Sequence, residues 1–226
     1  MAVNKETLKK MLPFRLDELL VFFLKSQEKA RRNKRIAQKN RRKIETLLKS
    51  EIPIKLELGA GTNRGIAGWT YADVNENCDL ILNLEAPIPF PDNSVSEIYS
   101  SHLLEHFHYH SLVNFLKECL RILKPGGLFN AAVPNAKIYM EAYQHPEAFD
   151  ADTFCQYKPA FNYNSKIDYV NYIAYMDGQH KYMFDEDNIV AILKKNSFKD
   201  VKLRKFDKIL DFQSRDIQSI YVLGKK

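Results

Sequence analysis

The chain has 226 residues, of which 45% are apolar and 27% are charged, values that are ordinary for globular proteins and argue against wholesale disorder or a fibrous repeat. Its length fits one medium-sized α/β domain with an additional segment. The net charge of +6 is unevenly spread, because residues 1–50 carry 15 Lys and Arg against 5 Asp and Glu, whereas the rest carry 19 against 23. A neutral to acidic body argues against a broad nucleic-acid-binding surface, which needs basic residues spread over a face.

Residues 1–50 are expected to form a basic helical extension, followed by the main domain at residues 51–226. Residues 5–49 hold few Gly or Pro and many helix-forming residues. Residues 25–43 are polar and basic without apolar periodicity, so this part is expected to be exposed to solvent. Three hypotheses stay open for it: a solvated helix without a partner, attachment to an anionic membrane or another polyanion, and contact with RNA, with nucleic acid not favoured.

Beyond Pro53, short apolar runs alternate with helical stretches, which is typical of an open, mostly parallel sheet with crossover connections. Strands are predicted at residues 54–58, 70–74, 80–84, 97–101, 127–133, 201–206 and 219–223. Only seven residues separate Gly61 from Trp69, which is too few for a full crossover helix between parallel strands. The first helix is therefore expected to be short or missing.

Apolar residues recur at i, i+3, i+4 and i+7 over residues 112–123, which predicts a helix that Ser111 caps. The following Lys124–Gly127 ends it, because Pro bars continuation and the glycines allow a tight reversal. Residues 135–183 are rich in Tyr, Phe and Asn, and we expect an insertion with short helices of its own. Its aromatic residues form either the wall of an acceptor pocket or a core for the insertion. Another helix is predicted at residues 185–196.

Three cysteines, Cys78, Cys119 and Cys155, form an odd set without C-x-x-C spacing, which predicts packing residues in a reducing compartment. No stretch approaches the roughly 18 consecutive apolar residues of a membrane span. Residues 1–10 also lack the apolar centre of a secretory signal. We therefore expect a cytoplasmic protein.

Two features fall at the ends of predicted strands. The first strand runs into Glu57-Leu58-Gly59-Ala60-Gly61, at the edge where open α/β sheets bind ligands, and the absent Cβ atoms let a ligand lie against the backbone. The next strand ends at Asp73, whose carboxylate can accept hydrogen bonds from both hydroxyls of a ribose. Together they predict a nucleotide-like ligand.

Five motifs stand in order along the chain: Leu56–Gly61, Asp73, Pro89–Ser94, Ser101–His106 and Leu123–Gly127. Over residues 54–135 they resemble the class I S-adenosylmethionine-dependent methyltransferases, in the methyltransferase-domain or type 11 branch. The segment from His180 to Lys199 is similar to the tail of a subgroup often linked to glycan biosynthesis. The resemblance implies a Rossmann-like α/β sheet, mostly parallel with an antiparallel C-terminal strand, and S-adenosyl-L-methionine as cofactor.

The same resemblance implies roles for individual residues. Glu57 would help to bind the ammonium group of the cofactor, beside Gly59, Ala60 and Gly61 at its amino-acid tail and ribose. The other residues that it places at the cofactor are Asp73 and Val74 at the ribose, Asn83 and Leu84 at the adenine, and Ser101 and His102 near the reactive methyl group. Asn83 keeps a hydrogen-bond acceptor but lacks the negative charge that the family usually has there. His102 and His180 are the candidates for a general base or for contacts to the acceptor.

The segment from His102 to His106 also spells H-x-x-E-H, a zinc-protease pattern in which two His and one Glu share a helix face. We expect no metal, because the segment follows a short strand within the methyltransferase motifs. Glu105 and His106 are expected to order the loop after the fourth strand. A dehydrogenase is disfavoured because Arg64 stands where G-x-G-x-x-G has its third glycine.

The leading functional hypothesis is methyl transfer from S-adenosylmethionine to an oxygen or nitrogen of a small molecule or glycan precursor. The glycan preference follows from the resemblance alone. One alternative is an RNA or protein methyltransferase that uses the basic extension. The other is a regulatory or scaffold protein that binds the cofactor without catalysis.

Overall fold

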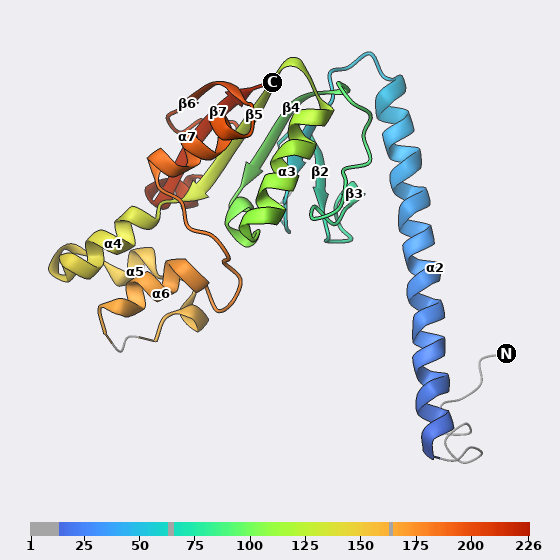
Figure 1. Ribbon diagram of the computed structural model, residues 1–226, viewed down its shortest axis with the longest axis horizontal. Coiled ribbons are helices and arrows are strands. Elements are labelled where there is room, and N and C mark those ends of the chain that lie inside the picture. The colour runs from blue at the N-terminus through green and yellow to red at the C-terminus, as the bar shows by residue number, and fades with distance from the viewer. Residues whose placement is uncertain (1–13, 63–65, 163–164) are drawn as a thin grey trace. The chain divides into compact units, whose positions relative to one another are not determined.

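A computed structural model describes residues 14–62, 66–162 and 165–226 of the chain (Figure 1). The chain divides into two compact units, which part between Glu45 and Thr46. The first unit holds most of helix α2, Phe14–Lys49. The predicted basic helix is thus confirmed from residue 14 onward, whereas the expectation for residues 5–13 lies outside the described residues.

The basic face of α2 is exposed to solvent, as expected from its lack of apolar periodicity. Arg31, Lys34 and Arg35 are all exposed, and the guanidinium of Arg41 donates to the carboxylate of Glu45 over 2.8 Å. Such an exposed pair contributes little to the stability of a helix, because solvent screens the attraction. None of the helices in the described part of the chain is long and apolar enough to cross a membrane.

The second unit contains a seven-stranded sheet with the order β3-β2-β1-β4-β5-β7-β6 (Figure 1). Its strands are β1 Lys55–Leu58, β2 Thr70–Asp73, β3 Leu80–Ile81, β4 Val95–Ser101, β5 Leu123–Pro134, β6 Lys199–Leu203 and β7 Ser219–Lys225. All neighbouring pairs are parallel except those of β7, which runs antiparallel to both β5 and β6. The predicted α/β sheet with an antiparallel C-terminal strand is therefore confirmed.

Every strand differs from its predicted bounds by one to four residues at one end or both, and β3 and β5 show the physical reasons. Strand β3 stops at Ile81, because the side chain of Asn83 accepts from Glu85 N over 3.1 Å and its carbonyl accepts from Ala86 N, which turns the chain. Strand β5 begins at Leu123 rather than at residue 127, because Leu123 pairs with Val95 ahead of an irregularity in the β4–β5 ladder.

Helix α3, Tyr109–Ile122, buries its predicted apolar face, with Leu112, Phe115 and Leu116 almost inaccessible to solvent. The prediction that Ser111 caps this helix is wrong, because the N-cap is His108 and Ser111 lies inside the first turn. Between β1 and β2 none of the described residues is helical, and residues 63–65 lie outside the described part. A short or missing first helix is what the spacing predicts.

The core of the sheet consists of side chains on the central strands, including Leu56, Leu58, Ile98 and Phe129, all with no exposed surface. Each such residue stabilises the fold by about 1.5–3 kcal/mol relative to an exposed position. Cys78, Cys119 and Cys155 are all buried and form no disulfide among the described residues, as predicted for packing residues.

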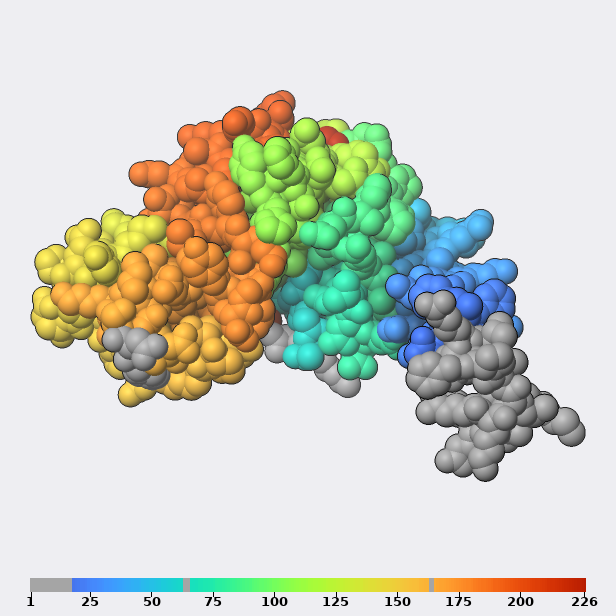
Figure 2. Space-filling view, turned by 60° about the horizontal axis from the view of Figure 1, so that its bottom comes forward, coloured from blue at the N-terminus to red at the C-terminus, as the bar shows by residue number. Residues whose placement is uncertain are grey.

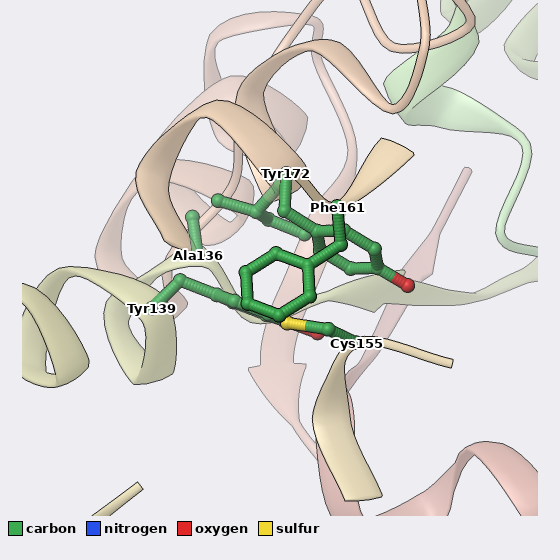
Figure 3. Packing of buried hydrophobic residues seen from close by; sticks show 6 residues of the cluster. Ala136, Tyr139, Cys155, Phe161 and Tyr172 are labelled. Atoms are coloured by element: carbon green, nitrogen blue, oxygen red, sulfur yellow. The ribbon is translucent and has the colours of Figure 1, made fainter. Parts of the chain in front are cut away.

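The segment after β5 forms the predicted insertion, with helices α4 Ala136–Gln144, α5 Ala151–Phe154 and α6 Ile167–Tyr175. These helices gather beyond the carboxyl end of β5 (Figure 1), and their yellow and orange atoms form a lobe in Figure 2. Inside the lobe, Tyr139 stacks on Tyr172 with ring centroids 5.6 Å apart, and both pack with Phe161 and Cys155 (Figure 3). These aromatic residues form a core for the insertion, which is one of the two predicted alternatives. Helix α7, Glu186–Lys195, follows and is capped by Asp185.

Candidate functional site

A cavity of about 260 Å³ lies at the carboxyl edge of the sheet, beside the ends of β1, β2 and β4. Seven of the predicted cofactor residues line it: Glu57, Gly59, Ala60, Gly61, Asp73, Ser101 and His102. They come together because β1, β2 and β4 are parallel, which brings the carboxyl ends of all three strands to one edge.

The two glycines of the turn after β1 are needed for different reasons. Both have positive φ, +77° at Gly59 and +61° at Gly61, a conformation that disfavours residues with a Cβ. A Cβ on Gly59 would lie 2.7 Å from Leu103 Cδ1, so the loop after β4 packs directly against this backbone. A Cβ on Gly61 would meet no described atom within 4 Å, so at this point the cavity wall leaves room for a ligand.

Asp73 is held in place by two backbone amides. Gly61 N donates to its Oδ2 and Asn75 N donates to its Oδ1, each over 3.0 Å. Each carboxylate oxygen has a further lone pair, so both oxygens can still accept from a ligand hydroxyl. The turn after β1 and the end of β2 are thus joined at the point where the cavity opens.

Glu57 is a buried carboxylate with an unsatisfied oxygen. Its exposed fraction is 2%, and its Oε2 has no hydrogen-bond partner among the described residues. Burial raises the pKa of Glu57, which a backbone hydrogen bond from Ile66 and the positive charge of Arg215 partly oppose. A buried acceptor without a partner costs about 1–3 kcal/mol, so a ligand with a donor group would relieve this cost.

His102 lies at the end of β4 with a positive φ of +51°. Its Nε2 is 2.8 Å from Ser219 Oγ, and that hydroxyl donates to Arg215 O over 2.7 Å. Since the hydroxyl proton is already used, the Nε2–H of His102 donates to Ser219 Oγ. Burial, with the nearby charges of Arg215, His180 and His106, lowers the pKa of His102 to about 3, so the ring is neutral at neutral pH.

Residues 70–131 match the profile of the family described as methyltransferase domain. A methyltransferase domain is thus matched from the start of β2 into β5. Over 50 residues it is 38% identical to a probable S-adenosylmethionine-dependent methyltransferase of Mycolicibacterium smegmatis, a match that spans 22% of this chain and 19% of that protein. The chain thus matches only about a fifth of the length of this curated relative.

Solved structures of methyltransferases are similar to this chain at low sequence identity. A SAM-dependent methyltransferase from Archaeoglobus fulgidus is 18% identical, with 91% of this chain and all of that chain covered at a TM-score of 0.45. A SAM-dependent methyltransferase from Methanosarcina mazei is 16% identical, with 81% and 96% covered at a TM-score of 0.48. S-adenosylmethionine is the cofactor that the matched methyltransferase domain implies.

The residues at the cavity fit this cofactor. Its ammonium group is a donor of the kind that Glu57 Oε2 lacks, and its ribose hydroxyls are donors of the kind that Asp73 could still accept. The open space at Gly61 admits a ligand close to the backbone.

Four predicted site residues lie outside the lining of this cavity. Val74 has an exposed fraction of 67%, Asn83 is exposed and engaged in its own turn, and Leu84 is buried beside it. His180 is buried, and its Nδ1 donates to Ile173 O over 2.7 Å. Its ring packs edge-on against that of His106, with centroids 5.2 Å apart.

Sequence reasoning missed Phe212 and Arg215, which also line the cavity. Arg215 Nη1 donates to Ser101 O over 3.3 Å, and its guanidinium lies 5.5 Å from the ring centroid of Phe212. Both residues precede β7, which begins at Ser219. Because β7 is antiparallel, its beginning lies at the same edge as the ends of the parallel strands, and this consequence of the predicted topology could have located both residues.

The H-x-x-E-H segment does not form the helix of a zinc protease. His102 follows β4, and Leu104–His106 form a short 3₁₀ turn. The carbonyl of Glu105 accepts from Lys181 N over 2.7 Å and from Tyr182 N over 3.1 Å, so this loop is tied to the segment that leaves the insertion. Burial raises the pKa of the Glu105 side chain to about 8.

Proposed function

We propose that the protein transfers a methyl group from S-adenosylmethionine to an oxygen or nitrogen atom of a small-molecule or glycan-precursor acceptor. The observation that carries the proposal is the buried, unpartnered Oε2 of Glu57 in the wall of a cavity that Asp73 and Gly61 also line. Few ligands combine a positive group, which a buried carboxylate can bind, with two neighbouring hydroxyls, which a second carboxylate can bind. S-adenosylmethionine has an ammonium group and a ribose, and therefore needs both.

In this proposal the residues at the three strand ends bind and orient the cofactor. Glu57 accepts from the ammonium group, Asp73 accepts from the ribose hydroxyls, and the turn from Gly59 to Gly61 gives the ligand a close approach to the backbone. Val74, Asn83 and Leu84 are proposed for the ribose and adenine end, outside the described lining. Bound S-adenosylmethionine supplies an electrophilic methyl group, so the protein mostly has to hold the acceptor in line, and such positioning is worth effective molarities on the order of 10⁵–10⁸ M.

Ser101 and His102 are proposed to lie near the reacting methyl group, since both line the cavity at the end of β4. His102 is also proposed to contact the acceptor. His180 lies behind His106 rather than in the lining, so its proposed contribution is to position His106 and the segment around it.

The position of Arg215 favours an acceptor that carries a negative group. It is a cation in the wall of the cavity, and none of the salt bridges among the described residues involves it. Phosphorylated glycan precursors carry such a group, and a guanidinium binds phosphate through two parallel hydrogen bonds.

Binding of the cofactor tests the proposal at Glu57. Glu57→Gln keeps the volume of the side chain but removes the charge that faces the ammonium group, and we expect S-adenosylmethionine to bind at least about tenfold more weakly, which is 1.4 kcal/mol. Glu85→Gln is the control, because Glu85 is exposed and lies outside the cavity. Equal affinity of wild type and Glu57→Gln would remove Glu57 from the site.

A nucleic-acid acceptor is the second candidate, favoured by the exposed basic residues of α2. Labelled S-adenosylmethionine should be offered with separate small-molecule, RNA and protein fractions, to the wild type and to a variant with Arg31, Lys34 and Arg35 replaced by Gln. The leading proposal expects label in the small-molecule fraction and no effect of the triple variant. Label in RNA that the triple variant loses would establish the second candidate instead.

A further inference from the structure

Three potential metal ligands converge beside the cavity, contributed by two segments far apart in the sequence. The Glu105 carboxylate and the His106 and His180 rings each offer a ligand atom, and these atoms lie within 4.8 Å of one another. His106 belongs to the turn after β4, whereas His180 belongs to the segment between α6 and α7. The two segments are held together by the hydrogen bonds from Lys181 N and Tyr182 N to Glu105 O.

The Glu105 side chain points into this cluster without a partner of its own. Its exposed fraction is 1%, and neither of its carboxylate oxygens has a hydrogen-bond partner among the described residues. A buried carboxylate of this kind is normally paired or bound to a metal ion. His106 Nε2 lies 4.0 Å from Glu105 Oε1, a separation too long for a hydrogen bond.

In both histidines Nδ1 makes a hydrogen bond to a backbone carbonyl, and Nε2 is available to bind an ion. His106 Nδ1 lies 3.0 Å from Gln179 O, and His180 Nδ1 lies 2.7 Å from Ile173 O. A carbonyl oxygen can only accept, so in both rings Nδ1 carries the proton and Nε2 keeps its lone pair. Histidine ligands of metals are held in the same way, by donation of the second nitrogen to a carbonyl or carboxylate.

The spacing is close to that of a metal site. Ligand bonds of about 2.1 Å at tetrahedral angles place two ligand atoms about 3.4 Å apart, so the 4.0 Å between His106 Nε2 and Glu105 Oε1 has to shorten by about half an ångström. The ligand atoms lie up to 4.8 Å apart, so binding of an ion also requires the side chains to rotate toward one another. His102 Nδ1 lies 3.8 Å from Glu105 Oε1, and because Nε2 carries the proton that is donated to Ser219, Nδ1 keeps its lone pair and donates no hydrogen bond to the carboxylate.

We propose that Glu105, His106 and His180 bind one divalent transition-metal ion such as Zn²⁺. Two imidazoles and one carboxylate are the ligand set of catalytic zinc sites and of related iron sites, which keep a position open for water or substrate. Because His106 also lines the cavity, this position lies where an acceptor would bind. The ion therefore binds an oxygen or nitrogen of the acceptor, a role that rests on the proposed methyl transfer, whereas metal binding itself does not.

Direct metal binding to the full chain tests the site. Protein stripped with a chelator should be titrated with Zn²⁺ against a chromophoric chelator, and in parallel with Co²⁺, whose visible absorption reports its ligands. We expect one ion per chain. Glu105→Gln and His180→Gln should each weaken Zn²⁺ binding at least about a hundredfold, since loss of a supporting partner alone costs about 10–100-fold.

His108→Gln is the matched control, because His108 is exposed, lies two residues beyond the cluster and makes no side-chain cap to α3. It should bind Zn²⁺ like the wild type. Circular dichroism checks that each variant folds. If a variant does not fold, His106→Gln is used in its place, because His106 is the most exposed of the three ligands. Wild-type protein without stoichiometric Zn²⁺, or ligand variants that bind as tightly as His108→Gln, would overturn the site.

Calorimetry with S-adenosylmethionine on the same samples separates the two proposals. Cofactor binding without metal binding would overturn the metal site alone. Metal binding without cofactor binding would leave the site in place and overturn the proposed function.

Discussion

Replacement of Gly59 by Ala is expected to destabilise the protein more than the same change at Gly61. Both positions have positive φ, which costs a residue with a Cβ about 1–2 kcal/mol. At Gly59 the new Cβ also lies 2.7 Å from Leu103 Cδ1 and 2.9 Å from Leu103 Cβ, contacts that real Cβ atoms do not make. The shift of the loop after β4 that this requires adds about 1–3 kcal/mol, as overpacking does in other cores.

The free energy of unfolding should therefore fall by about 2–5 kcal/mol in Gly59→Ala and by about 1–2 kcal/mol in Gly61→Ala. For a chain of this size, a difference of about 1–3 kcal/mol separates the two melting temperatures by about 2–12 °C. Thermal unfolding followed by circular dichroism measures both variants. Gly68→Ala is the strain control, because Gly68 has φ +82°, open space at its Cβ among the described atoms and no place in the cavity.

The affinity for S-adenosylmethionine should also differ among the glycine variants. Gly61→Ala places a methyl group in the open wall of the cavity and should weaken S-adenosylmethionine binding, while Gly68→Ala should not. If Gly59→Ala were no less stable than Gly61→Ala, the close packing of Leu103 on the turn would be refuted.

Three further outcomes follow from the contacts of other residues. The Arg121 guanidinium donates to Glu118, to Asp92 and to two carbonyls of the 88–90 segment. Arg121→Lys should therefore lower the free energy of unfolding, measured by urea titration, by about 1–3 kcal/mol. Lys117→Ala, at an exposed position, is the control and should leave this free energy unchanged. The hydrogen bond from Arg121 lowers the pKa of Glu118 below 4.5. Glu118 therefore stabilises the fold above about pH 4.5, and this contribution is lost as the pH falls through the folded pKa. Glu118→Gln should be less stable than wild type at pH 7 and equally stable in acid, and a difference in stability that does not change with pH would contradict the pairing. Burial raises the pKa of the Cys119 thiol far above its usual range and that of Cys155 to about 12, so neither should react with a thiol reagent at pH 8 until the protein unfolds, as peptide mapping would show.

Much of the fold could be predicted from the sequence because its strands and helices have strong local signals. The run of apolar residues in β1 and β4, and the helical periodicity of α3, gave the elements within a few residues. Boundaries set by individual hydrogen bonds were harder. Asn83 ends β3 through its side chain, and His108 rather than Ser111 precedes α3, and neither follows from periodicity.

The candidate site was predictable only where it lies next to a strand end. Glu57, Asp73 and Ser101 follow from strands that are parallel and adjacent, so their positions in the cavity could be inferred from topology. The placement of His180 beside His106 could not, because it depends on how the chain returns from the insertion. Long-range contacts of this kind are fixed by tertiary packing and leave no local pattern.

Calorimetry tests most directly whether Asp73 and the turn after β1 bind S-adenosylmethionine. Asp73→Ala removes the acceptors for the ribose hydroxyls and also the hydrogen bond that holds Gly61 N. We expect S-adenosylmethionine and its demethylated product both to bind wild-type protein and to lose at least about tenfold in affinity in Asp73→Ala, with Glu85→Gln unaffected. Affinity in Asp73→Ala equal to that of wild type would contradict the assignment of the site.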